Sequence, residues 1–379
     1  MTALQFLADS SANDAIREKL REFPNRVYFP NFGKGDNIFK EGIDIDRVLF
    51  TVPGTNFKIY WYGFLITIGI LLAMIYGFRR MKTVGIDPDR ATDAVIGGLI
   101  GAIFGARFYY IIFNTEGMKF SEFFDIRDGG LAIYGGLIGA IIVGGIIAKV
   151  RKLKLTALLD VVAPCFLIGQ CIGRWGNFFN QEAFGCNTTL PWGMFSEATE
   201  DYLMGSTVTV PKGVTIDPAM PVHPTFLYES IWCFVGLALL AAYIKKRKFN
   251  GDIALRYLVW YGAGRFWIEA LRTDSLLLVP SLGLRASQLV AAAAVVGGVA
   301  LEIFLTRKYK SKPLMVTLAL TAENRSLLAK VRKAEPEFTV EREELVASSP
   351  RKLFLERTNA YNEQVKQQLK EKLAEKKDA

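Results

Sequence analysis

Residues 60–78 read YWYGFLITIGILLAMIYGF, and two arginines follow at positions 79 and 80. This stretch carries no charged side chain, and about 20 apolar residues in a helix are needed to cross the ~30 Å hydrocarbon core of a bilayer. Six further stretches read in the same way: about 91–113, 130–148, 156–180, 225–244, 253–271 and 285–306. The sequence therefore predicts an all-α integral membrane protein, a bundle of seven transmembrane helices.

Basic residues cluster after alternate spans and predict the orientation of the chain. Four basic residues follow each of the first, third, fifth and seventh spans, as in KKRK at Lys245–Lys248. The other loops are acidic; residues 181–222 hold Lys212 against five acidic residues. Because positive loops stay on the cytoplasmic side, we predict that the N-terminus lies outside and the C-terminus is cytoplasmic.

These spans divide the chain into three predicted regions. Residues 1–58 are an extracytoplasmic N-terminal segment, 59–306 are the seven-helix transmembrane domain with an external loop region at 181–222, and 307–379 are a basic cytoplasmic tail. No apolar h-region of a cleavable signal peptide is visible in residues 1–50. Residues 359–379 are rich in Glu, Lys and Gln, which predicts an exposed helix or a disordered extension.

Composition excludes several kinds of site. The chain has a net charge of +9, and its basic residues lie beside the apolar runs and in the tail. Their positions indicate membrane topology rather than binding to nucleic acid. His223 is the sole histidine, which excludes a histidine-rich metal site. The four cysteines form no CxxC pair; three lie in apolar runs, and Cys186 has no evident disulfide partner.

Charged residues within the spans are the strongest functional signal, because charges in a bilayer are costly and usually functional. The predicted orientation places one group at the outer ends of the spans: Arg107, Arg174, Arg265, Glu269 and Arg272, with Tyr62, Tyr134, His223 and Glu229 in spans that begin outside. Asp93 and Asp160 lie near inner ends, where a structural or snorkelling role is expected.

The sixth span presents Tyr261, Arg265, Glu269 and Arg272 on one helical face, because their spacing is i, i+4, i+8 and i+11. A pair between Arg265 and Glu269 would neutralise itself and leave Arg174 and Arg272 unpaired. We therefore expect a surplus of positive charge. The phosphate of a lipid headgroup is the anion expected at that depth.

Residues 173–185 read GRWGNFFNQEAFG and place Arg174, Asn177, Asn180 and Glu182 where the fourth span ends. Asparagines at the end of a helix can also have a purely structural role, in which they help to satisfy the hydrogen bonds of the helix C-terminus. The segment resembles the signature of the prolipoprotein diacylglyceryl transferases, G-R-x-G-N-F-x-N-x-E-x-x-G, at every fixed position. Four further strings agree in order: WYG at Trp61–Gly63, GGLIGAIFGARFYY at Gly97–Tyr110, HPTFLYE at His223–Glu229 and YGAGRFWIEALR at Tyr261–Arg272.

The resemblance covers about Ile59–Thr306. It implies a bacterial plasma-membrane enzyme that moves the sn-1,2-diacylglyceryl group of phosphatidylglycerol to the lipobox cysteine of a prolipoprotein. Glycerol 1-phosphate is released, and no cofactor or metal is needed. The implied catalytic residues are Arg174, Arg265, Glu269, Arg272 and Tyr134. The implied substrate-binding residues are Tyr62, Asn177, Asn180, Glu182, Gly185, Gly135 and His223.

The chain departs from the family pattern at two positions. Tyr134-Gly135-Gly136 stands where many members have HGG, and Phe226 replaces a glutamine. A histidine base therefore cannot be general, and Glu269, Tyr134 or a phosphate oxygen remains as the acceptor of the thiol proton.

Two other classes of protein share some of these features. The first is the CDP-alcohol phosphatidyltransferases. Residues Asp125–Ala132 of this chain match the opening of their motif, but Ile133 replaces the motif's arginine and the later aspartates are missing. A lipid flippase or small-molecule transporter would place polar residues through the whole depth of the membrane, whereas here they concentrate outside.

Overall fold

A computed structural model describes residues 17–33, 37–113, 130, 132–205, 216–274, 277–279, 284–310 and 313–375. Its chain forms two compact units. The first unit comprises Met1–Ile75, Ala163–Ala242 and Leu255–Leu305, and the second comprises Tyr76–Val162, Tyr243–Ala254 and Thr306–Ala379. Parts of the predicted N-terminal segment, external loop region and tail, and the stretch 114–129, lie outside the described residues.

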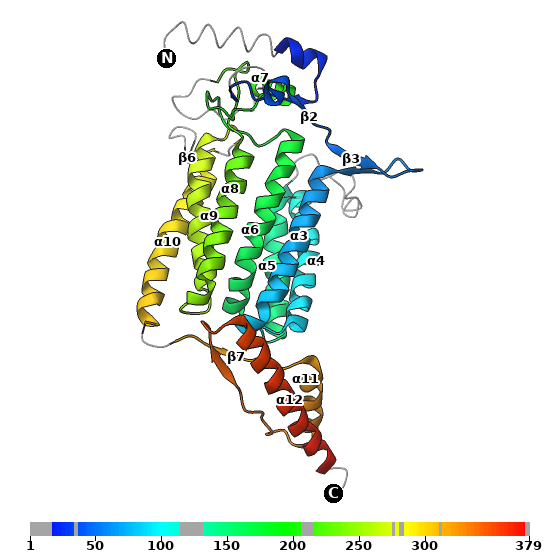
Figure 1. Cartoon of the computed structure of the whole chain (residues 1–379), viewed down its shortest axis with the longest axis vertical. Helices are drawn as coiled ribbons and strands as arrows, with labels where there is room; N and C mark the ends of the chain where they lie inside the picture. Colours follow the sequence, from blue (N-terminus) through cyan, green and yellow to red (C-terminus); the bar gives the residue numbers. More distant parts are fainter. Residues whose placement is uncertain are drawn as a thin grey trace. The chain divides into compact units, whose positions relative to one another are not determined.

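Long helices coincide with the apolar stretches of the sequence (Figure 1). They are α3 (Trp61–Met81), α4 (Pro88–Phe113), α5 (Ile133–Val150), α6 (Leu155–Asn180), α8 (Thr225–Tyr243), α9 (Asp252–Leu271) and α10 (Ala286–Lys308). Within the described residues, five helices are long and apolar enough to cross a membrane: α3, α4, α6, α8 and α10, where α3 continues into η1 (Lys82–Val84) and α8 into η3 (Ile244–Lys246).

The two remaining helices differ from these five in length or charge. The apolar part of α5 is shorter, Tyr134–Val150, and α9 includes Asp252, Arg256, Arg265 and Glu269. The helical, membrane-spanning character is therefore confirmed, while the number of seven spans and the orientation stay predictions.

In the first unit, two tryptophans lock α8 to α9. Trp232 and Trp260 stack with their ring centroids 4.4 Å apart. The indole N–H of Trp232 donates to the carbonyl of Trp260 at 2.9 Å, and that of Trp260 donates to the carbonyl of Trp232 at 3.0 Å. Gly236 and Gly264 make room for the rings, since a Cβ on either would lie 2.3 Å from an indole nitrogen. This pairing fixes the helices that carry the site residues.

The N-terminal segment and residues 181–222 fold together. The backbones of Tyr28 and Phe195 exchange two hydrogen bonds of 2.8 Å. A common core holds Val27, Ile45, Phe184, Met194, Leu203, Val222 and Phe226. The short elements here are β1 (Arg26–Val27) with β2 (Ile43–Asp44), β3 (Val48–Thr51) with β4 (Lys58–Tyr60), α2 (Ile38–Glu41) and α7 (Glu197–Met204). The two segments, predicted separately, thus share one core.

In the second unit, small residues bring α4 and α5 into backbone contact. A Cβ on Gly139 would lie 2.0 Å from the carbonyl oxygen of Gly101, and one on Gly105 would lie 2.4 Å from that of Gly135. Only glycine allows so close an approach. The string GGLIGA, which occurs at 97–102 and again at 135–140, therefore marks a packing seam.

Asp160 has the structural role that its sequence position predicts. Its carboxylate accepts hydrogen bonds from the backbone N–H groups of Gly251, Ile253 and Ala254 at 2.9–3.1 Å. These groups lie at the start of α9, whose first N–H groups have no partners within the helix. Asp93, the other such residue, forms an ion pair of 2.8 Å with Arg151.

The tail forms a folded module. It comprises the hairpin of β7 (Met315–Thr317) and β8 (Glu344–Val346), α11 (Ala322–Ala334) and α12 (Arg351–Glu375). Its core holds Val316, Leu318, Val331, Phe354, Tyr361, Val365 and Leu369. Of the two alternatives predicted for residues 359–379, the helix is confirmed over 359–375, but one face of it is buried rather than exposed. Tyr361, Val365 and Leu369, spaced four apart, form a buried stripe within a polar composition.

Candidate active site

Glu229 is the hub of a polar cluster in the first unit. Its Oε1 lies 2.6 Å from Nη2 of Arg174 on α6, and its Oε2 lies 3.6 Å from Nη1 of Arg265 on α9. The hydroxyl of Tyr261 donates to Oε1 at 3.2 Å. The Glu229 side chain is 3% exposed, whereas Arg174 and Arg265 are each 23% exposed. One buried carboxylate therefore holds two arginines that keep an accessible edge.

A second carboxylate extends this cluster along α9. Nη2 of Arg265 lies 2.5 Å from Oε2 of Glu269, so the predicted Arg265–Glu269 pair is confirmed. The backbone carbonyl of Glu269 accepts a hydrogen bond from Arg285, a buried residue that directly precedes α10. Arg285 is the last residue of β6 (Leu284–Arg285), which pairs with β5 (Leu277–Val279). The end of α9 is thus held from outside the helix.

Arg272 follows the end of α9 and is clamped by Asp274. Its Nε donates to Oδ1 at 2.7 Å and its Nη2 to Oδ2 at 2.5 Å, a bidentate pair. Burial is the largest single effect and would raise the pKa of the Asp274 carboxyl, but the hydrogen bonds and the charge of Arg272, with smaller contributions from a backbone hydrogen bond and from Arg265, together lower it.

The prediction of two arginines without carboxylate partners is wrong. The spacing predicts that Arg174 and Arg272 are unpaired, but Arg174 pairs with Glu229 and Arg272 with Asp274. The reason is that pairing crosses between helices and loops, whereas the spacing within α9 reveals pairs along one helix alone. An arginine has five N–H donors, so one carboxylate orients the guanidinium and leaves donors for a second anion.

The signature segment forms a tight turn after α6. Glu182 Oε1 accepts hydrogen bonds from the amides of Asn177 at 3.1 Å and Asn180 at 3.2 Å. The residues on either side of Glu182 are in the left-handed region, Gln181 with φ 55° and Ala183 with φ 57°. Such a conformation costs energy in residues other than glycine and is often found at functional sites. The signature therefore encodes a turn that fixes Glu182 against the end of α6.

Gly185 joins three parts of the site. Its N–H donates to the carbonyl of His223 at 2.9 Å, and it pairs with Arg272 across an isolated bridge. A Cβ at this position would lie 2.9 Å from both His223 Cβ and the carbonyl oxygen of Leu271, so the backbones approach closely only with glycine. His223 Nδ1 lies 3.0 Å from the hydroxyl of Tyr228, and burial lowers the pKa of its imidazole.

The remaining predicted residues divide between the units. Tyr62 on α3 packs against Gly176 of the signature, where a Cβ would lie 2.6 Å from the ring. Tyr134 and Gly135 belong to the second unit. Gly135 packs on the backbone of α4, where a Cβ would lie 2.3 Å from the carbonyl oxygen of Gly105, and Tyr134 is 70% exposed.

A family model described as "Prolipoprotein diacylglyceryl transferase" matches residues 47–304. This is more than half of the chain. The chain belongs to the prolipoprotein diacylglyceryl transferase family. The match contains every predicted site residue and ends before the tail.

Relatives with the name phosphatidylglycerol–prolipoprotein diacylglyceryl transferase include a protein of Finegoldia magna, 42% identical over 271 residues, covering 71% of this chain and 97% of that protein. One from Clostridium novyi is 44% identical over 269 residues, covering 70% and 98%. One from Bacillus cereus is 43% identical over 257 residues, covering 66% and 89%.

Three polar residues of the site are not among the site residues that the sequence predicts. The sequence marks Glu229 as a charge within a span and as part of HPTFLYE, but not as the hub. Asp274 lies between two apolar stretches and Arg285 at the first position of the last one, so neither stands out as a charge within a span. Among the described residues, no group of three or more His, Cys, Asp or Glu side chains is placed to hold a metal ion.

Proposed function

We propose that this chain transfers the sn-1,2-diacylglyceryl group of phosphatidylglycerol to the lipobox cysteine thiol of prolipoproteins, the first step of lipoprotein maturation. The two substrates, phosphatidylglycerol and a prolipoprotein, are those in the names of its relatives. The observation that carries the proposal is the arrangement of Arg174 and Arg265, both held by buried Glu229 and both partly accessible.

The reaction is a substitution at carbon. The S–C bond to the glyceryl carbon forms, and the C–O bond to the phosphate breaks, so that glycerol 1-phosphate leaves with the electron pair. The leaving phosphate gains negative charge, which preorganised donors in a low-dielectric site stabilise. Arg174 and Arg265 bind this phosphate, and Glu269 and Arg272 orient them. Asn177 and Tyr62 hydrogen-bond to the headgroup.

The attacking thiol must lose its proton, because the thiolate is the nucleophile and a free cysteine has a pKa of about 8.5. Nearby guanidinium groups favour the thiolate. Glu269, Tyr134 and a phosphate oxygen of the lipid are the three candidate acceptors of the proton.

The same proposal includes the topology. All seven helices α3–α6 and α8–α10 span the bacterial plasma membrane, with the N-terminus outside and the C-terminus in the cytoplasm. The alternating basic segments of the sequence support this orientation. The catalytic domain is then residues 59–306, flanked by an extracytoplasmic segment, 1–58, and a cytoplasmic tail, 307–379. The arginine cluster lies in the outer half of the membrane.

The test is to incubate the purified protein with phosphatidylglycerol and a lipobox peptide and to measure the mass of the product. We expect a thioether-linked diacylglyceryl adduct, with the same yield in EDTA. A peptide with serine in place of the lipobox cysteine is the matched control and should gain no mass. Absence of the adduct, or a strict requirement for Mg²⁺, would contradict the proposal.

A further inference from the structure

The second unit contains a pocket of about 640 Å³ between the tail and the loops that join its helices. One wall is the turn after η1, residues Val84–Asp87, and another is the α5–α6 loop at Lys152–Lys154. The tail contributes β7, the following residues up to Leu320, and one face of α11. A volume of this size accommodates a small molecule. The pocket shares no residue with the candidate active site.

The lining of this pocket is strongly basic. Seven lysines and arginines line it, against the single carboxylate of Asp87. Arg90 comes from α4, Lys152 and Lys154 from the α5–α6 loop, and the other four from the tail. Cations from segments so far apart in sequence repel one another when they converge. Such a concentration of one sign of charge in a hollow attracts a counter-ion.

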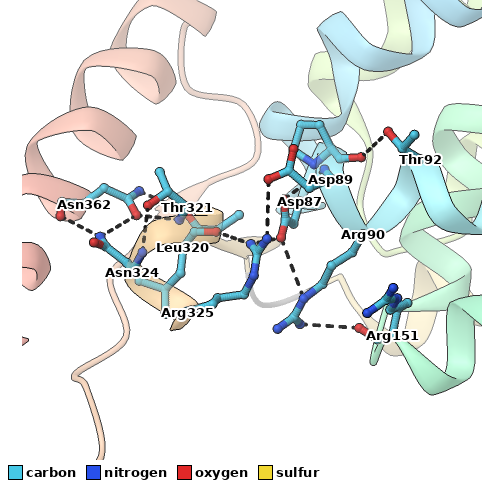
Figure 2. Close-up of polar contacts among 12 residues, drawn as sticks. Asp87, Asp89, Arg90, Thr92, Arg151, Leu320, Thr321, Asn324, Arg325 and Asn362 are labelled. Carbon is cyan, nitrogen blue, oxygen red and sulfur yellow. Dashed lines mark hydrogen bonds and ion pairs between the residues drawn. The ribbon is translucent and has the colours of Figure 1, made fainter. Parts of the chain in front are cut away.

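Asp87 is already occupied by two of these arginines. Figure 2 shows Arg325 of α11 reaching Asp87 and Asp89, and Arg90 reaching Asp87. Arg325 also donates to the carbonyl of Leu320 at 2.6 Å. Arg325 therefore connects the tail to the turn after η1, and Arg90, which also donates to the carbonyl of Arg151 at 3.4 Å, connects α4 to the α5–α6 loop. Asp87 cannot neutralise the rest of the pocket.

The tail wall is fixed by a buried amide pair. The amide of Asn324 donates to the carbonyl of Asn362 at 2.7 Å, and the N–H of Thr321 donates to the Asn362 side chain at 2.7 Å (Figure 2). On the opposite wall, Gly85 has φ +72°, and a Cβ there would lie 2.7 Å from the carbonyl oxygen of Thr317. Contacts within the chain thus hold both walls in place.

Arg332, the fifth of the other lining cations, donates to the carbonyl of Phe338 at 2.9 Å, so four cations remain for a ligand. Lys152, Lys154, Lys333 and Arg342 line the pocket, and none of them forms an ion pair with another residue in the part of the chain that the structure describes. We propose that this pocket binds a phosphate-bearing anion, either a soluble polyphosphate or the headgroup of an anionic lipid. Lysine and arginine donors that converge from two sides match the several acceptor oxygens of such a group.

The test uses the full-length protein and one probe for each source. Inorganic pyrophosphate is titrated calorimetrically into the protein in a neutral detergent. Phosphatidic acid, an anionic lipid with a terminal phosphate, is presented in phosphatidylcholine nanodiscs, and the lipid retained by the protein is measured by native mass spectrometry. Saturable binding of pyrophosphate indicates a soluble ligand, and selective retention of phosphatidic acid indicates a lipid ligand. Binding of neither probe overturns the proposal.

Two double variants locate the binding. Lys152→Ala with Lys333→Ala removes two exposed pocket cations, and Lys330→Ala with Lys370→Ala removes two exposed cations outside the pocket. We expect the pocket variant to weaken binding by about tenfold or more, while the control variant stays within twofold of wild type and both keep the wild-type unfolding temperature. Equal binding by the pocket variant and wild type would also overturn the proposal.

Discussion

Asp160 and Glu229 are both buried carboxylates on long helices, and both lie near arginines, yet their surroundings differ. Asp160 is fully buried; it accepts three backbone hydrogen bonds, and its partner Arg247 is 1% exposed. Glu229 is also buried, but its two arginine partners are each 23% exposed. In the first case the donors around the carboxylate are sealed inside the protein. In the second case the guanidinium donors of the two arginines remain partly accessible from outside the protein.

We propose that this difference separates a structural charge from a functional one. The backbone groups around Asp160 belong to the start of α9 and would otherwise lack partners, so that carboxylate completes the fold. Glu229 completes no helix end. It holds two guanidinium groups whose remaining donors can bind a further anion, which is the geometry that recognition of phosphate requires.

The strongest expected effect is that of Arg174→Lys. The charge survives, but an ammonium group cannot hold Glu229 and two phosphate oxygens as a planar guanidinium can. We expect turnover of phosphatidylglycerol to fall by about 10²-fold or more. Arg256→Lys is the matched control, because Arg256 also pairs with a carboxylate, Glu302 at 2.5 Å, outside the cluster. A folded Arg174→Lys enzyme with near wild-type turnover would exclude the bidentate role.

Tyr134→Phe tests whether the second unit contributes to the chemistry. The ring is kept and one hydrogen bond is lost, so we expect a decrease in rate of roughly 5–150-fold. Tyr134→His should be tolerated, since relatives in the family have histidine there. Turnover of both variants is measured across pH 6–9 with membrane insertion checked. A loss above ~10⁴-fold in the phenylalanine variant would make Tyr134 the proton carrier instead of Glu269.

Asp160→Asn probes the sealed carboxylate and should separate stability from catalysis. It leaves Arg247 buried without its ion pair, and breaking such a pair destabilises a protein by about 3–5 kcal/mol. We expect a lower unfolding temperature but a kcat within about threefold of wild type below that temperature. The reverse result, wild-type stability with lost activity, would place Asp160 in the catalytic machinery.

Deletion of residues 314–379 should have the smallest effect on activity. The tail has its own core, and the family match ends at residue 304. We expect measurable turnover by the truncated protein, with reduced thermal stability because Asp87 loses Arg325. Loss of turnover in a correctly inserted truncation would show that the tail takes part in catalysis.

The sequence predicted the helices well because a run of apolar residues has few alternatives to a buried or membrane helix. It also predicted the Arg265–Glu269 pair, whose spacing follows from the helix repeat. Glu229 was harder to assign, because its partners lie on two other helices and no spacing along one helix reveals them.

Two other features were not evident from sequence for different physical reasons. The fold of the tail was hidden because its polar composition outweighed the buried stripe of Tyr361, Val365 and Leu369. The strained turn at Gln181 and Ala183 has no signal in residue type, since both are residues that rarely adopt the left-handed conformation.

The central claim is that the arginines held by Glu229 bind the phosphate of the substrate. Titration of glycerol 1-phosphate, the proposed product, into wild type, Arg174→Lys and Arg256→Lys tests it without depending on turnover. We predict that Arg174→Lys raises Kd by about tenfold or more, while Arg256→Lys stays within twofold of wild type. Equal affinity in wild type and Arg174→Lys would contradict the claim.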